Sequence, residues 1–136
     1  MGRILAIDYG KKRTGLAVTD PLKIIATGLT TVETKGLMAY LLAYLAREPV
    51  DLFIIGDPKN NDGSETDATR PVNQFIGRLG KSFPGVPVIR MDERYTSRMA
   101  SRSMVESGMK KKDRRNKALV DEISAVLILQ GYLQSH

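Results

Sequence analysis

Apolar and polar residues follow one another along the chain in a pattern that predicts strands first and helices later. Short runs rich in β-branched residues predict strands at 3–7, 14–19 and 25–32. A continuous apolar run predicts a buried strand at 52–55, and a shorter run predicts a fifth strand at 88–91. Asp20-Pro21 closes the second strand and Gly56 closes the fourth.

Helical spacing of apolar residues appears between these strands and after the last of them. A first helix is predicted to end before Pro49 and to present Leu37, Leu41, Leu42, Tyr44 and Leu45. A second is predicted to end near Gly80 and to present Val72, Phe75, Ile76 and Leu79. Two further helices are predicted at 97–107 and 115–134, joined by a lysine-rich connection.

The order of these elements predicts the fold class. Three consecutive strands favour an antiparallel meander, and the later strand–helix–strand units favour parallel pairing with right-handed crossovers. We therefore expect an α/β protein with a mixed five-stranded sheet flanked by helices. No internal repeat, low-complexity tract or long linker divides residues 1–136, so one domain is expected.

Composition narrows the possible chemistry. The chain has no cysteine and one histidine, His136, so thiolate sites, disulfides and histidine-dependent triads are not expected. Carboxylates would have to carry any catalysis, and all-oxygen sites favour Mg²⁺ or Mn²⁺. No apolar stretch approaches the roughly 20 residues of a membrane span, and no signal-peptide layout is present. These features are compatible with a reducing, cytoplasmic location.

The positive charge is concentrated in one part of the sequence. The chain carries a net charge of +6, and residues 94–117 contain nine basic and two acidic residues, so this window holds the whole excess. Clustered lysine and arginine favour a polyanionic partner, because they release counterions from phosphates. A solubilising loop is the alternative interpretation.

A carboxylate stands where the first strand runs into a tight turn. Asp8 is followed by Tyr9-Gly10-Lys11-Lys12-Arg13-Thr14-Gly15, and the second strand begins within this segment. A carboxylate at the end of a buried strand must be solvated, hydrogen-bonded or bound to a cation. A turn-capping aspartate is the alternative.

Further acids lie at strand ends or in loops, and one pair lies in the most apolar helix. The first group comprises Asp20, Asp57, Asp62, Asp92 and Glu93. In the helix, Asp121 shares a face with Ala125 and Ile128, whereas Glu122 shares one with Val126 and Leu129. Spacing alone does not decide which of the two acids points inward.

Four blocks of the sequence together resemble the bacterial YqgF-type family over essentially the whole chain. Its members are known as Holliday-junction resolvases and as nucleases that process the precursor of 16S ribosomal RNA. The blocks are 8–15, 56–65 (Gly-Asp-Pro-Lys-Asn-Asn-Asp-Gly-Ser-Glu), 92–97 (Asp-Glu-Arg-Tyr-Thr-Ser) and 120–130, which begins Val120-Asp121. Asp57 departs from the family, which more often has an apolar residue before this proline, and it adds negative charge near the expected site.

The resemblance implies a ribonuclease-H-like fold and an acidic site formed by Asp8, Glu93 and Asp121. It therefore selects Asp121 over Glu122. Three crowded carboxylates repel one another, and a divalent cation would make such a cluster tolerable. The hypothesis is an endonuclease with one or two Mg²⁺ or Mn²⁺ ions bound to these residues, which needs no protein base.

Other residues are candidates for substrate binding. Arg13 is expected to contact the scissile phosphate, with a surface strand charge as the alternative. The basic segment is expected to track backbone phosphates without reading sequence, through Lys110, Lys111, Lys112, Arg114, Arg115 and Lys117. Asn61, Asp62 and Ser64 are candidates for a substrate loop, or else form a plain polar turn. Thr96 or Ser97 is expected to cap the following helix.

Two other function classes fit parts of the pattern. The chain could be a non-catalytic RNA-binding or ribosome-assembly factor. The segment from Asp8 to Gly15 also resembles the phosphate loop of the actin and sugar-kinase group, although those proteins clamp nucleotide between two domains. The expected partner is nucleic acid, either precursor 16S rRNA or branched DNA, and the expected state is a monomer or a homodimer.

Overall fold

The computed structural model describes residues 2–57, 69–92 and 117–135. The strands are β1 (Arg3–Asp8), β2 (Arg13–Thr19), β3 (Ala26–Glu33), β4 (Val50–Asp57) and β5 (Val88–Asp92). The helices are the short 3-10 helix η1 (Thr34–Gly36), α1 (Leu37–Arg47), α2 (Thr69–Ser82) and α5 (Lys117–Ser135). The predicted helix at 97–107 and the lysine-rich connection lie outside these ranges.

One mixed sheet holds the described strands together. The five strands lie in the order β3-β2-β1-β4-β5. β1 pairs antiparallel with β2, and β2 pairs antiparallel with β3. β4 pairs parallel with β1 and with β5. The predicted meander and the later parallel pairs are therefore confirmed.

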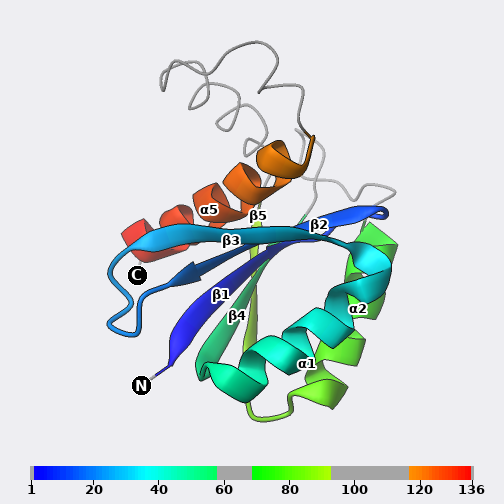
Figure 1. Ribbon diagram of the computed structural model, residues 1–136, viewed down its shortest axis with the longest axis horizontal. Coiled ribbons are helices and arrows are strands. Elements are labelled where there is room, and N and C mark those ends of the chain that lie inside the picture. The colour runs from blue at the N-terminus through cyan, green and yellow to red at the C-terminus, as the bar shows by residue number, and fades with distance from the viewer. Residues whose placement is uncertain (1, 58–68, 93–116, 136) are drawn as a thin grey trace.

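Alternation along the strands divides the core into two layers. Leu5 and Ile7 of β1 pack in one layer with α1 and α2, whereas Ile4 and Ala6 pack in the other with α5. Figure 1 shows α1 and α2 on one side of the sheet and α5 on the opposite side. Because neighbouring residues of a strand point to opposite faces, each functional side chain can be assigned to one layer.

The layer under α5 contains three alanines among larger apolar residues. Ala6, Ala17 and Ala125 are fully buried there, beside Leu129. Small side chains let the helix lie close to β1 and β2. This close approach brings the amino-terminal part of α5 to the carboxyl end of β1.

The predicted elements differ from the observed ones in small ways. The spacing predicts Leu42 in the apolar stripe of α1, but this residue is exposed (53%), because it lies on the outer face of the helix. β4 begins two residues earlier than predicted and extends through Asp57, which is therefore a strand residue rather than a loop residue. No helix in the described ranges is long and apolar enough to cross a membrane.

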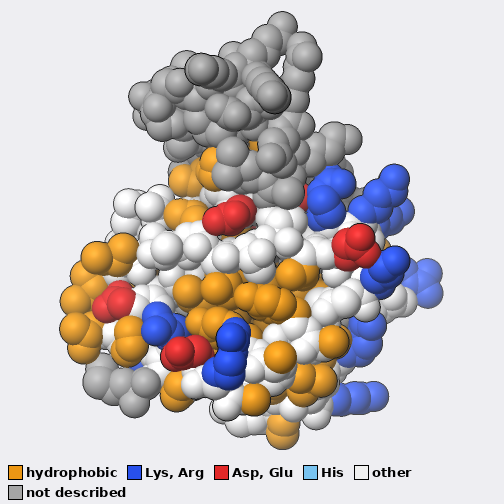
Figure 2. All heavy atoms as spheres, in the orientation of Figure 1, with side chains coloured by type: hydrophobic (Ala, Val, Ile, Leu, Met, Phe, Trp, Pro, Cys, Tyr) orange, Lys and Arg blue, Asp and Glu red, His pale blue; other side chains and the backbone are white. Residues whose placement is uncertain are grey.

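The turn between β2 and β3 is organised by one carboxylate. Asp20 accepts hydrogen bonds from the amides of Leu22 (3.1 Å), Ile24 (2.8 Å) and Ile25 (2.8 Å). Those three apolar side chains are exposed, and hydrophobic side chains gather at this end of the molecule in Figure 2. Lys23 has a φ of 61° and bonds to Asp51 (2.7 Å). Asp20 thus has a structural role.

Candidate active site

Asp8 is the last residue of β1 and lies on the sheet face that α5 covers. Ile4 and Ala6, four and two residues earlier, pack against α5, so alternation assigns Asp8 to the same face. Its partner across the antiparallel pair is Gly15 of β2. Opposed residues of such a pair project to the same side of the sheet.

α5 passes directly over Gly15. A Cβ atom added to Gly15 would overlap the backbone carbonyl of Asp121 and lie 3.0 Å from the amide nitrogen of Glu122. Only glycine allows this approach of helix to strand. Since Asp8 projects to the same face, the backbone of Asp121 is brought beside Asp8 at the carboxyl end of β1.

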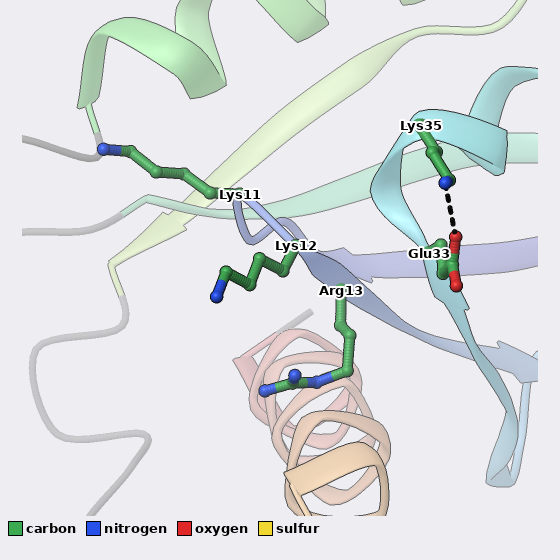
Figure 3. A pocket seen from close by; sticks show the side chains of 5 residues that line it. All are labelled: Lys11, Lys12, Arg13, Glu33 and Lys35. Atoms are coloured by element: carbon green, nitrogen blue, oxygen red, sulfur yellow. Dashed lines mark ion pairs between the residues drawn. The ribbon is translucent and has the colours of Figure 1, made fainter.

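Arg13 links β2 to this helix. Its Nε donates to Oδ2 of Asp121 over 3.2 Å, and the two side chains are 37% and 26% exposed. Figure 3 shows Arg13 extending from the start of β2 toward α5. Asp8, Arg13 and Asp121, all predicted site residues, therefore lie together on one face.

Glu122 points to a different part of the sheet. A Cβ atom on Gly28 of β3 would meet the carboxyl group of Glu122, so this side chain lies over β3. Asp121 instead contacts Arg13 at the start of β2. The two acids that helical spacing could not distinguish are thus separated by the strands they face.

The turn between β1 and β2 is compact and tied to η1. A side chain at Gly10 would overlap the carbonyl oxygen of Arg13, so the turn requires glycine there. The Thr34 hydroxyl lies 2.5 Å from the Gly10 carbonyl oxygen and 2.9 Å from the Thr14 hydroxyl. The Thr34 amide donates to the Lys12 carbonyl over 2.9 Å. These bonds fix the backbone that carries Lys11, Lys12 and Arg13.

A basic hollow opens beside this turn. It has a volume of about 490 Å³ and is lined by Lys11, Lys12, Arg13, Glu33 and Lys35. Glu33 pairs with Lys35 over 3.3 Å, and both side chains are exposed to solvent. Figure 3 shows Lys11, Lys12 and Arg13 spreading outward from the turn, and basic side chains gather on this side of the molecule in Figure 2. Sequence reasoning missed the three lysines, although Lys11-Lys12-Arg13 is a visible basic run.

Asp57 belongs to the opposite face of the sheet. Phe53 and Ile55 of β4 pack with α1 and α2, so alternation assigns Asp57 to their side. Its Oδ1 lies 3.6 Å from Nη1 of Arg90 on β5. The expectation that Asp57 adds negative charge near the site is therefore not supported: it faces away from Asp8 and pairs with a cation.

Several predicted residues lie outside the described ranges. They are Glu93, the loop residues Asn61, Asp62 and Ser64, the capping candidates Thr96 and Ser97, and the basic residues 110–115. Lys117 begins α5. Within residues 2–57, 69–92 and 117–135, no three histidine, aspartate or glutamate side chains form a metal-binding group.

Comparison with known proteins adds an independent result. A family model described as "RuvX: Holliday junction resolvase" matches residues 2–135. The chain belongs to this family. The RuvX and YqgF-type names refer to one family, so the resemblance carried by the four sequence blocks is confirmed.

Relatives share about half of their residues with this RuvX-family chain. A protein of Porphyromonas gingivalis is 55% identical over 135 residues, which cover 99% of this chain and 98% of the relative. A protein of Phocaeicola vulgatus is 56% identical, with coverage of 99% and 97%. Both carry the name "Putative pre-16S rRNA nuclease".

Solved structures agree with the fold. RuvC of Thermus thermophilus in complex with a Holliday junction substrate aligns with a TM-score of 0.60 at 18% identity, covering 99% of this chain and 96% of that one. A second Thermus thermophilus RuvC structure aligns with a TM-score of 0.58 at 17% identity. Likeness at this identity bears on the fold, and it confirms the predicted ribonuclease-H-like class.

Proposed function

We propose that this protein is a divalent-metal-dependent endonuclease that hydrolyses phosphodiester bonds in structured nucleic acid. The nuclease class is supported by the family match and by the names of the relatives. The observation that carries the mechanism is the placement of Asp8 and Asp121 on one sheet face, brought together by the close approach at Gly15.

The residues at this site suit a hard cation. Asp8 and Asp121 offer only carboxylate oxygens, the ligands that Mg²⁺ and Mn²⁺ prefer. Glu93 is the proposed third ligand and follows Asp92, the last residue of β5, in the sequence. When bound, the metal would polarise the phosphoryl oxygen and lower the pKa of a coordinated water.

Arg13 is the proposed contact to the scissile phosphate. Its guanidinium lies beside Asp121, and the Arg13 side chain as a whole is more than one-third exposed, so substrate can reach it. An arginine fork matches phosphate geometry and strengthens as charge develops on the phosphate oxygens. Arg13 would then orient the phosphate over the carboxylates.

Cleavage by matched variants tests the catalytic assignment. Asp8→Asn and Asp121→Asn should each reduce Mg²⁺-dependent cleavage about a hundredfold or more, because each removes a ligand charge. Glu122→Gln removes the same charge one residue away, over β3, and should retain activity. Full activity of either aspartate variant, with folding verified by circular dichroism, would refute the proposal. Loss of activity in Glu122→Gln alone would reverse the assignment of the two helix acids.

The substrate is proposed from the relatives. Their name points to precursor 16S rRNA, whereas the family description points to four-way DNA junctions. We propose precursor rRNA, because the relatives match over nearly their whole length at 55% and 56% identity. Side-by-side cleavage of end-labelled precursor rRNA and junction DNA by the purified protein decides between them. Paired symmetrical cuts in junction DNA, with intact rRNA, would reverse the choice.

A further inference from the structure

The basic hollow beside the β1–β2 turn is larger than the proposed phosphate contact of Arg13 requires. Among the described residues, Lys11, Lys12 and Lys35 line it together with Arg13, against one acid, Glu33. Lys35 pairs with Glu33, whereas Lys11 and Lys12 spread outward from the turn (Figure 3), so the hollow carries an excess of positive charge that favours an anionic ligand. The bonds from Thr34 hold the turn that carries Lys11 and Lys12 against η1, which is followed directly by α1, so the hollow is largely preformed.

A second hollow adjoins the first and has a different character. Its volume is about 280 Å³, and its lining shares Lys11 and Lys35 with the basic hollow. Its walls include the partly buried Met38 and the fully buried Leu37 and Phe75, and Tyr9 and Arg78 supply an aromatic ring and a guanidinium. Tyr9 stacks on Phe75 with ring centroids 4.8 Å apart, and the Arg78 guanidinium lies 5.9 Å from the centre of the Phe75 ring.

Both hollows lie at the end of the sheet that carries the β1–β2 turn. The basic hollow extends toward the face covered by α5, and the second hollow lies toward the face covered by α1 and α2. Arg13 points to the α5 face, whereas Phe75 and Leu37 belong to the core layer under α1 and α2. A line from Arg13 past Lys12 and Lys35 to Arg78 therefore leads from the proposed catalytic face around the β1–β2 turn. Basic side chains come first along this line, and a hollow with aromatic and apolar walls follows.

We propose that this path binds an unpaired strand of the nucleic acid next to the cleavage site. Its phosphates would lie against Lys11, Lys12 and Lys35, and a base would enter the hollow of Tyr9 and Arg78. Cationic grooves with aromatic side chains are the usual means of binding single strands. A stiff double helix cannot follow a path that turns around the end of a sheet, whereas a flexible single strand can. The inference rests on the proposed function for the position of the cut, and it names a substrate with unpaired nucleotides beside it.

Binding measured without cleavage tests the phosphate part. The probes are a fluorescently labelled RNA hairpin with a blunt end and the same hairpin with a six-nucleotide unpaired extension. Fluorescence anisotropy with the full-length protein in EDTA should show tighter binding of the extended hairpin. Lys11→Gln/Lys35→Gln should remove that preference. It should also reduce the slope of log affinity against log salt by about 0.7 for each lost phosphate contact on a single strand.

A second double variant that removes the same charge elsewhere serves as the control. Arg47 ends α1 before β4, and Lys81 lies near the end of α2 before β5, so both lie at the opposite end of the parallel strands. Arg47→Gln/Lys81→Gln also removes two positive charges and should leave the preference for the extended hairpin intact. Equal losses in the two double variants would overturn the path and indicate a general effect of net charge.

An abasic nucleotide tests the second hollow. Replacing one base of the extension by an abasic site should weaken binding to the wild-type protein about fivefold or more, the lower end for a stacked base. The same replacement should weaken binding to the Arg78→Gln variant less, because part of the contact is already absent there. If the abasic site and Arg78→Gln each reduced affinity independently, with additive losses at every position of the extension, base binding in this hollow would be refuted.

The binding assay tests the path and the cleavage assay tests the nuclease, so each proposal can be refuted without the other. Retained extension-specific binding in a protein that cleaves no substrate would refute the proposed nuclease and leave the path intact. Cleavage that is lost in Asp8→Asn but indifferent to an unpaired strand would refute the path and leave the nuclease intact.

Discussion

Arg13 and Asp121 are separated by more than one hundred residues in sequence, yet Nε of Arg13 lies 3.2 Å from Oδ2 of Asp121. The contact joins the start of β2 to α5 across the face that carries Asp8. Since both side chains are partly exposed, the pair contributes little to stability. Its consequence is electrostatic: a guanidinium balances one of the carboxylates proposed to bind metal.

Replacing Arg13 should therefore strengthen metal binding while weakening catalysis. Arg13→Gln removes the cation that competes for Asp121, and a partly exposed pair of this kind corresponds to an increase in Mn²⁺ affinity of about two- to fivefold. Isothermal titration calorimetry of the metal-free variant measures this change. Cleavage should fall, because the proposed phosphate contact is lost.

The matched control for this prediction is Arg90→Gln. Arg90 pairs with Asp57 on the opposite sheet face, so its loss should leave Mn²⁺ affinity unchanged. An equal gain in both variants would show that only net charge matters. Weaker Mn²⁺ binding in Arg13→Gln would mean that Arg13 positions Asp121 for the metal instead of competing with it.

Gly15→Ala should destabilise the protein and separate the two carboxylates. The added methyl group would overlap the backbone of Asp121, and backbone cannot move aside as a flexible side chain can. Forcing an extra carbon into a packed interior costs about 1–3 kcal/mol of unfolding free energy. Urea denaturation measures the loss, and cleavage should fall further than stability alone explains, because α5 carries Asp121 away from Asp8.

Gly77 provides the contrasting substitution. It lies inside α2, and outside the backbone of its own helix no atom of the described residues lies within 4 Å of an added Cβ. Gly77→Ala should therefore stabilise the protein by about 0.5–1 kcal/mol, since alanine loses less backbone entropy in a helix. A Gly15→Ala variant as stable as Gly77→Ala would contradict the close approach of α5 to β2.

Local pattern was sufficient for the sheet but not for the whole site. The alternation of β1 and the turn after it predicted a carboxylate at a strand end, because those signals are contained in neighbouring residues. Helical spacing could not separate Asp121 from Glu122, since both lie beside apolar neighbours and only the packing of α5 over Gly15 and Gly28 distinguishes them.

Contacts between residues that are far apart in the sequence could not be predicted from the sequence. Lys35 reaches the basic hollow because η1 is hydrogen-bonded to the β1–β2 turn through Thr34, a contact that no spacing rule encodes. Asp57 was expected near the site, but β4 continues through this residue, and alternation turns it to the other face. In both cases tertiary placement decided the outcome.

Two carboxylates in the described part of the chain should make the free energy of unfolding depend on pH. Amide hydrogen bonds, chiefly from Ile25 and Ile24, lower the pKa of Asp20. A hydrogen bond from Lys23 and another from the amide of Gly2 lower the pKa of Asp51. A lowered folded-state pKa stabilises the protein above the unfolded value of about 3.9, and this contribution is lost as the pH falls through the folded value.

Asp20→Asn and Asp51→Asn should therefore be less stable than the wild type at pH 6. The difference should narrow as the pH falls below about 3.9, because the wild-type carboxylates become protonated as well. Thermal denaturation between pH 6 and pH 2.5 measures the gap. A difference that stayed constant across this range would show that the two side chains act through shape alone.

The lysine-rich segment 110–112 lies outside the described residues, so its role is predicted from charge alone. Lys110→Gln/Lys111→Gln/Lys112→Gln should weaken binding to duplex nucleic acid and reduce the slope of log affinity against log salt by about 0.9 for each lost phosphate contact. Lys11→Gln/Lys35→Gln should change duplex binding little, because its path is proposed to take an unpaired strand. Measuring both variants on blunt and extended hairpins separates the two surfaces. An unchanged salt slope in the triple variant would mean that these lysines face solvent when nucleic acid is bound.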